Sequence, residues 1–223
     1  MVETHISLSV NRLLNEDTYA IPLYQRNFAW TYDEIEQLLN DVADAFQENR
    51  DNYYIGTLVV NKEKDIFKII DGQQRTTALN LIALALKHEF GFDRLKAVNL
   101  KFPARKKSNE NIQYLFTKQE ISEDDENELT RGYGYAKDAL KKVLEERRID
   151  SQSFVDYLFE NVIIFRSILP EDLDLNLYFE RFNSRGEQLE AHEILKAQMM
   201  AKFGTDQEMA QKFARIWDAC AEF

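Results

Sequence analysis

The segment I-I-D-G-Q-Q-R-T-T-A-L at residues 69–79 places five consecutive polar or glycine residues between two apolar stretches. The first stretch has the composition of a strand, and the second has that of a buried helix. A strand that runs through a glycine turn directly into a helix leaves several backbone N–H groups unpaired at the positive end of the helix dipole. The sequence therefore predicts an anion site at this junction.

Two residues of the turn indicate that the anion is a phosphate. Gly72 has no Cβ, so the chain can turn with a positive φ and a phosphate can approach the backbone closely. Arg75 offers a planar guanidinium group that fits phosphate oxygens in pairs. An ordinary Asp-Gly turn before a solvated helix start is the alternative interpretation, and the residues alone leave both open.

Composition restricts the class of protein. With 223 residues, of which 44% are hydrophobic, the chain is long enough to bury a real core. We expect a soluble, cytoplasmic protein, because no apolar run could span a bilayer and the N-terminus lacks the pattern of a signal peptide. The single cysteine, Cys220, excludes an intrachain disulfide, and three scattered histidines indicate no metal site.

The formal charge of -11 argues against a domain that coats duplex DNA through bulk electrostatics. The charge is uneven, however, because an acidic run at residues 120–128 contrasts with a local basic cluster. A modest nucleic-acid contact is one interpretation of this cluster, and a plain surface loop is the other. The basic cluster consists of Lys101, Arg105, Lys106 and Lys107.

Hydrophobic periodicity predicts an α+β chain that is mostly helical. Thr31 and Glu34 have the spacing of a capping box at the start of one helix, and the helix at residues 76–89 is apolar nearly all round, which is typical of a buried central helix. The expected helices are residues 8–14, 31–49, 76–89, 109–118, 134–147, 151–159, 175–183, a helix from 194 and 206–221. The expected strands are residues 53–60, 66–70, 95–102 and 162–168.

Three polar blocks, at residues 21–30, 71–75 and 179–186, mix arginine with amides or carboxylates at helix boundaries, where phosphate and metal recognition is easiest to build. Glu180 and Asn183 lie on one helix face and could hold a hard cation through oxygen, with a solvated face as the alternative. Tyr24 and Trp30 are candidates for base stacking, and core packing is the alternative for each.

Taken together, these segments resemble the N-terminal domain of GmrSD-type restriction endonucleases. The likeness rests on four blocks and covers nearly the whole chain. It implies a ParB/sulfiredoxin-like α+β fold, with a small sheet and a buried central helix in residues 1–105 and a mainly helical part in residues 106–223. The blocks are I-P-L-Y-Q-R-N-F-A-W at residues 21–30, Y-I-G-T-L at 54–58, I-I-D-G-Q-Q-R-T-T-A-L at 69–79 and Y-F-E-R-F-N-S-R-G-E-Q-L at 178–189.

The resemblance implies a nucleotide-binding, NTP-hydrolysing module that regulates a modification-dependent, type IV-like DNA restriction or anti-phage system. Mg2+ is the expected cofactor, and an NTP is the substrate or effector. The implied roles are hydrolysis for Asp71, Gln73, Gln74 and Arg75, nucleotide binding for Tyr24, Gln25, Arg26, Gly72, Thr76 and Arg185, and metal binding for Glu180 and Asn183.

One departure from the family pattern concerns the nuclease. Relatives usually carry a C-terminal nuclease domain with a histidine-rich site, and this sequence has no such motif. We therefore expect a chain that does not cut DNA by itself and works with a nuclease domain or a separate nuclease subunit, with DNA and a second copy of the chain as further partners. The alternatives are a non-catalytic module that binds DNA or nucleotide, and a scaffold that docks the nuclease subunit.

Overall fold

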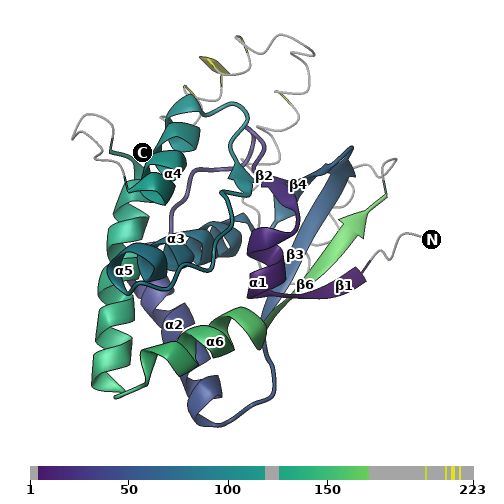
Figure 1. Ribbon diagram of the computed structural model, residues 1–223. Helices are drawn as coiled ribbons and strands as arrows, with labels where there is room; N and C mark the ends of the chain where they lie inside the picture. The colour runs from purple at the N-terminus through teal and green to yellow at the C-terminus, as the bar shows by residue number, and fades with distance from the viewer. Residues whose placement is uncertain are drawn as a thin grey trace.

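The computed structural model describes residues 5–118 and 126–170, together with the single positions 199, 209, 212, 213 and 216. These residues form a mixed sheet with helices gathered to one side of it (Figure 1). The strands are β1 (His5–Ser9), β2 (Thr18–Ala20), β3 (Tyr53–Glu63), β4 (Ile66–Asp71), β5 (Leu100–Lys101) and β6 (Val162–Leu169). The helices are α1 (Val10–Asn15), α2 (Tyr32–Gln47), α3 (Gln73–Glu89), α4 (Lys106–Thr117), α5 (Glu128–Glu146) and α6 (Ser151–Glu160).

The strand order in the sheet is β1-β6-β3-β4-β2-β5. The pairs β3/β6, β2/β4 and β2/β5 are parallel, whereas β1/β6 and β3/β4 are antiparallel. The late strand β6 lies between β1 and β3, so the sheet contains strands from both sides of residue 105. The expected division of the chain at that residue stays a prediction.

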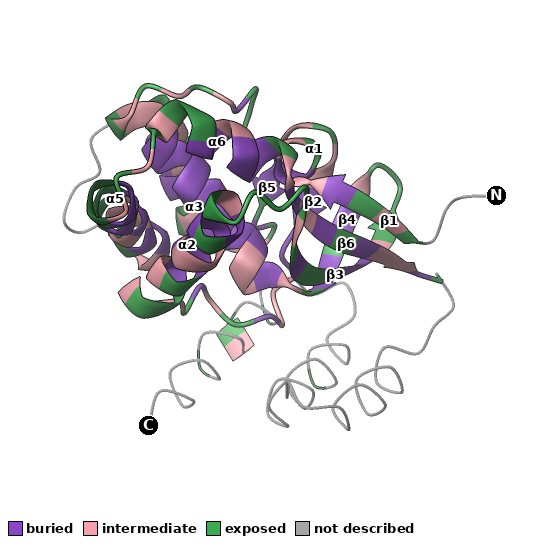
Figure 2. Cartoon of the chain, turned by 90° about the horizontal axis from the view of Figure 1, so that it is seen from below, coloured by how far each residue is buried: buried purple, intermediate pink, exposed green. Residues whose placement is uncertain are grey.

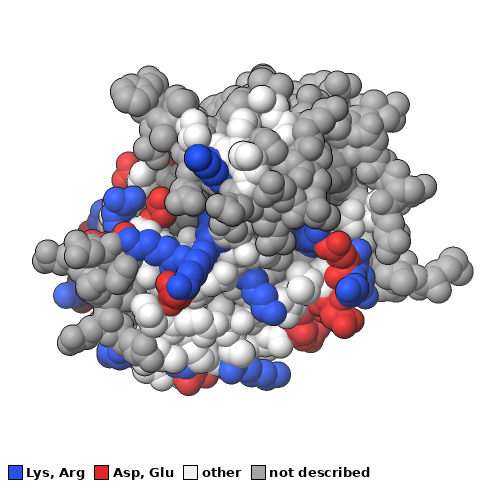
Figure 3. Space-filling view, turned by 90° about the horizontal axis from the view of Figure 1, so that it is seen from above, with Lys and Arg blue, Asp and Glu red and all other residues white. Residues whose placement is uncertain are grey.

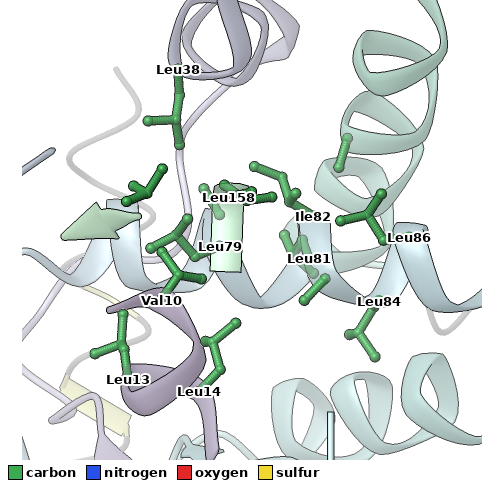
Figure 4. Close-up of a cluster of buried hydrophobic side chains, with 14 of the residues drawn as sticks. Val10, Leu13, Leu14, Leu38, Leu79, Leu81, Ile82, Leu84, Leu86 and Leu158 are labelled. Atoms are coloured by element: carbon green, nitrogen blue, oxygen red, sulfur yellow. The ribbon is translucent and has the colours of Figure 1, made fainter. Parts of the chain in front are cut away.

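Helix α3 is the centre of the core. Every residue from 76 to 86 is buried, because the sheet with α1 lies on one side of the helix and α2, α5 and α6 lie around it (Figures 1 and 2). Side chains of α1, α2 and α6 converge on the leucines and Ile82 of α3 in Figure 4. The predicted α+β class, the small sheet and the buried central helix are confirmed, while the finer ParB/sulfiredoxin-like likeness stays a prediction.

The start of α2 follows from its sequence. Glu34 accepts hydrogen bonds from the backbone N–H and the hydroxyl of Thr31, both at 2.7 Å. The reciprocal bond closes the capping box, which satisfies N–H groups that a helix start otherwise leaves unpaired. The predicted cap is therefore confirmed, and it fixes the end of the segment at residues 21–30 that reaches the site.

Some boundaries differ from the expectations. Leu8 belongs to β1, where it pairs with Ile164, rather than to the first helix. The short strand β2 was not predicted, and β5 is shorter than the strand expected at residues 95–102. Strands this short are defined by the partners that hydrogen-bond to them, and local composition carries little information about such pairing.

The helices expected at 175–183, from residue 194 and at 206–221 lie outside the continuous described ranges. The same is true of most of the acidic run. Within the part of the chain that the structure describes, no helix has the length and apolar character needed to cross a membrane.

Candidate functional site

Gly72 forms the turn between β4 and α3. Its φ is 91°, in the left-handed region that favours glycine. A Cβ added here would lie 2.9 Å from the carbonyl oxygen of Thr57 and 3.2 Å from a methyl carbon of Leu58. The predicted positive φ is confirmed, and the close approach of β3 adds a second reason for glycine at this position.

The start of α3 leaves backbone donors at the turn. The backbone N–H and the hydroxyl of Thr76 both donate to the carbonyl of Gly72 at 3.0 Å. This is the first backbone bond of the helix, so the N–H groups of residues 73–75 have no acceptor within it. The cap residue is Gly72, which has no side chain to accept from these groups, and the first turn contains no acidic residue. The geometry of the turn is the one that the sequence prediction requires, and binding of an anion there stays a prediction.

Thr76 contributes to this arrangement from inside the protein. Its side chain is completely buried, and its hydroxyl holds the Gly72 carbonyl. The predicted role of Thr76 in nucleotide binding stays a prediction, and the burial favours an indirect role through the shape of the turn.

Two glutamine side chains join the turn to the segment at residues 21–30. The amide of Gln74 donates to the carbonyl of Asn27 at 2.9 Å and accepts from the N–H of Ala29 at 2.8 Å. From the opposite side, the buried Gln25 donates to the carbonyl of Ile70 at 2.8 Å. The two blocks that sequence analysis selected separately are therefore in direct contact, and Gln74 has a clear positioning role.

The neighbours of Gln25 lie beside the same turn. Burial raises the pKa of Tyr24 to about 12, so its hydroxyl is neutral at physiological pH. The guanidinium of Arg105 donates to the carbonyl groups of Gln25 and Arg26, which brings the basic cluster next to this loop. Lys and Arg side chains form a row on the face shown in Figure 3.

Arg75 lies against a bulge in β3. Its Nη1 would be 2.8 Å from a Cβ added to Gly56, whose φ is 108°. Burial is the largest cause that raises the pKa of Tyr53, and the positive charge of Arg75 opposes it. Gly56 was not among the predicted site residues, although an isolated glycine inside a strand pattern is a recognised signal for a bulge.

Asp71 ends β4 and is exposed. It pairs with Val59 of β3, one residue before the Gly72 turn. Within the described residues, no group of three or more histidine, cysteine, aspartate or glutamate side chains could hold a metal ion. The predicted ligands Glu180 and Asn183, and the predicted nucleotide contact Arg185, lie outside the described residues.

Comparison with known proteins supports the sequence resemblance. Residues 10–200 match the family described as GmrSD restriction endonuclease, N-terminal domain. A search of curated proteins found no match. The family match covers well over half of the chain and includes the Gly72 turn, the Gln25 loop and the Gly56 bulge. The chain therefore belongs to the family of GmrSD restriction endonuclease N-terminal domains.

Proposed function

We propose that this chain is a nucleotide-binding and NTP-hydrolysing regulatory module of a modification-dependent DNA restriction system. The observation that carries the proposal is the turn at Gly72, where the first N–H groups of α3 have no acceptor within the helix and the nearby guanidinium of Arg75 adds a full positive charge, so both could bind phosphate. The family supports the restriction system, in which a nuclease domain or subunit is the partner.

The reaction is attack of water on the terminal phosphate. A bond forms between the water oxygen and phosphorus, the bond to the leaving phosphate oxygen breaks, and the proton of the water passes to a base. Asp71 lies at the turn and is the candidate for that base or for a metal ligand. The N–H groups of α3 and Arg75 stabilise the negative charge that develops on the phosphoryl oxygens.

The two glutamines have separate roles in this proposal. Gln74 holds the loop at residues 27–29 through both ends of its amide, so it positions the wall of the site. Gln73 is its neighbour in the first turn and is buried, at 7% exposure. Gln73 therefore orients the attacking water, because the amide of Gln74 already has two backbone partners.

We propose that Mg2+ binds at the turn together with the nucleotide. A magnesium ion bound with a nucleotide commonly takes one or two protein carboxylates, the remaining positions being filled by phosphate oxygens and water, and Asp71 supplies an exposed carboxylate. When bound, the ion would neutralise negative charge on the phosphates. Glu180 and Asn183 remain proposed further ligands.

The test is release of phosphate from each of the four NTPs with and without Mg2+, with the nuclease partner and DNA supplied. Asp71→Asn should keep much of the affinity and lower turnover by about 10²-fold or more. Equal loss of affinity and turnover would assign Asp71 to the structure of the turn. Wild-type protein without Mg2+-dependent hydrolysis would contradict the proposed chemistry.

Binding of nucleic acid without hydrolysis is the second candidate. It is favoured by the contact between Arg105 and the carbonyl groups of Gln25 and Arg26, which places the basic cluster beside the site. Phosphate contacts of this kind weaken strongly as salt increases. Binding of single-stranded DNA that survives in Asp71→Asn, in a protein that hydrolyses no NTP, would support this alternative.

A further inference from the structure

Two aromatic side chains on the sheet are unusually exposed. Tyr54 in β3 is 60% exposed and Phe165 in β6 is 41% exposed. All other aromatic side chains among the residues whose burial is described are at least partly buried. Exposed rings that gather in one place are typical of a binding surface, whereas single exposed apolar residues are ordinary.

The bulge at Gly56 brings these two rings to the same face. Tyr54 pairs with Ile163, and Thr57 pairs with Phe165, so β3 contains one residue more than β6 over this stretch. Because side chains alternate along a strand, Tyr54 and Thr57 would point to opposite faces in a regular strand. The extra residue in the bulge interrupts this alternation once. Tyr54 and Thr57 therefore lie on the same face, which is the face that carries Phe165.

The same face carries the end of β4. Asp71 pairs with Val59, which in turn pairs with Ser167, two residues after Phe165. Gly72 lies against Thr57, and β6 is one strand spacing, about 4.8 Å, beyond β3. The distance between the phosphate-binding turn and the two exposed rings is therefore one that a single nucleotide could span.

The surroundings of the rings mix polar and apolar side chains, a combination that suits a nucleobase with its apolar faces and polar edges. Thr57, Asn61 and Ser167 share the face with the two rings through their strand pairing, and so do the partly buried Ile163 and the buried Val59 and Leu169. The rings suggested by sequence for stacking are less accessible, because Trp30 packs partly buried against the core and Tyr24 is also partly buried.

We propose that Tyr54 and Phe165 form a stacking surface for the base of a nucleotide whose phosphates bind at the Gly72 turn. The inference rests on the proposed function and adds the position of the base. Aromatic rings stack on any unpaired base, so the base of a free NTP and the base of a single strand present the same chemistry. The free nucleotide is the expected source because of the adjacent phosphate-binding turn.

The experiment compares three ligands by calorimetric titration of the full chain: an NTP, inorganic triphosphate and a short single-stranded oligodeoxynucleotide. Tyr54→Ala and Phe165→Ala should each weaken NTP binding at least about fivefold, the effect of losing one stacking contact. Inorganic triphosphate should bind both variants as it binds wild type. Arg75→Ala should weaken binding of the NTP and of triphosphate together.

Conservative and control variants separate stacking from folding. Tyr54→Phe and Phe165→Tyr should keep wild-type affinity because the ring remains. Ile216→Ala removes another exposed apolar side chain, which is 58% exposed, and should leave all three affinities unchanged. Wild-type thermal unfolding of the alanine variants would show that the sheet is intact.

The remaining outcomes are distinct. If only oligonucleotide binding depends on the rings, the stacking surface is supported and a single strand supplies the base. If Tyr54→Ala and Phe165→Ala bind the NTP and the oligonucleotide as wild type does, the stacking surface is overturned and the proposed function stands. If wild type binds none of the three ligands, both proposals are overturned.

Discussion

The guanidinium group of Arg75 lies against Gly56, so close that a Cβ added to Gly56 would come within 2.8 Å of Nη1. Arg75 belongs to the first turn of α3, and Gly56 lies in the bulge of β3. The contact joins the block at residues 54–58 to the block at residues 69–79. Both blocks thus contribute to one local structure, in which the missing side chain of a glycine leaves space for the arginine.

Gly56→Ala should disturb this contact. The φ of 108° is strained for alanine, and Arg75 would have to move, so we expect the free energy of unfolding to fall by about 1–3 kcal/mol. NTP affinity should fall as well. The control is Gly134→Ala in α5, where nothing lies within 4 Å of the new Cβ. It should raise stability by about 0.5–1 kcal/mol. Unchanged NTP affinity in folded Gly56→Ala would contradict the link to Arg75.

Gly72→Ala should be more destabilising than Gly91→Ala, as measured by chemical denaturation. Both glycines have a positive φ, which costs alanine about 1–2 kcal/mol. A Cβ at Gly91 meets nothing within 4 Å, whereas a Cβ at Gly72 meets the backbone oxygen of Thr57 at 2.9 Å. Equal losses of stability in the two variants would show that β3 moves away from the turn at no cost.

Gln74→Ala should lower the free energy of unfolding by about 1–3 kcal/mol, because it removes two hydrogen bonds to the loop at residues 27–29. Gln74→Glu keeps an acceptor for the N–H of Ala29 but loses the donor to the carbonyl of Asn27. Its free energy of unfolding should therefore lie between those of wild type and Gln74→Ala. Gln37→Ala is the control, since Gln37 lies on the exposed face of α2 and donates to Asp41 of the same helix. A stability loss of the same size in Gln37→Ala would remove the special role of Gln74.

Arg75→Ala should weaken nucleotide binding by about 1.5–3 kcal/mol, the scale of a charge-assisted hydrogen bond to phosphate. Arg75→Lys should recover only part of the loss, because an ammonium group lacks the planar fork. Arg12→Ala provides the control, since Arg12 of α1 forms an exposed ion pair with Glu16, the residue that follows the helix. Titration calorimetry measures all three, and unchanged affinity in folded Arg75→Ala would refute the phosphate contact.

Glu34 should make the stability of α2 depend on pH. Hydrogen bonds first from the side chain and then from the backbone of Thr31 lower its pKa in the folded state. A lowered folded pKa contributes stability above the unfolded pKa, and this contribution is lost as the pH falls through the folded value. Urea denaturation between pH 7 and 3 should therefore show a smaller acid-dependent loss in Glu34→Gln than in wild type. Identical pH profiles would contradict the capping role of the carboxylate.

Local patterns were sufficient for several elements. The capping box at Thr31 and Glu34 fixed the start of α2, and the apolar run after Arg75 identified the buried helix α3, because both depend on residues a few positions apart. The positive φ of Gly72 was predictable for the same reason. The family was also recognisable from the sequence blocks, and residues 10–200 match it.

Other features were decided only when distant segments met. The clamp of Gln74 on Asn27 and Ala29 spans more than forty residues, and the strand β2 exists because it pairs with β4 and β5. The common face of Tyr54 and Phe165 depends on the register of β3 against β6. A shift of one residue moves a side chain to the other face of a sheet, and local sequence does not fix that register. Sequence alone therefore determined the turn and the central helix. Strand register and long-range hydrogen bonds determined which residues surround them.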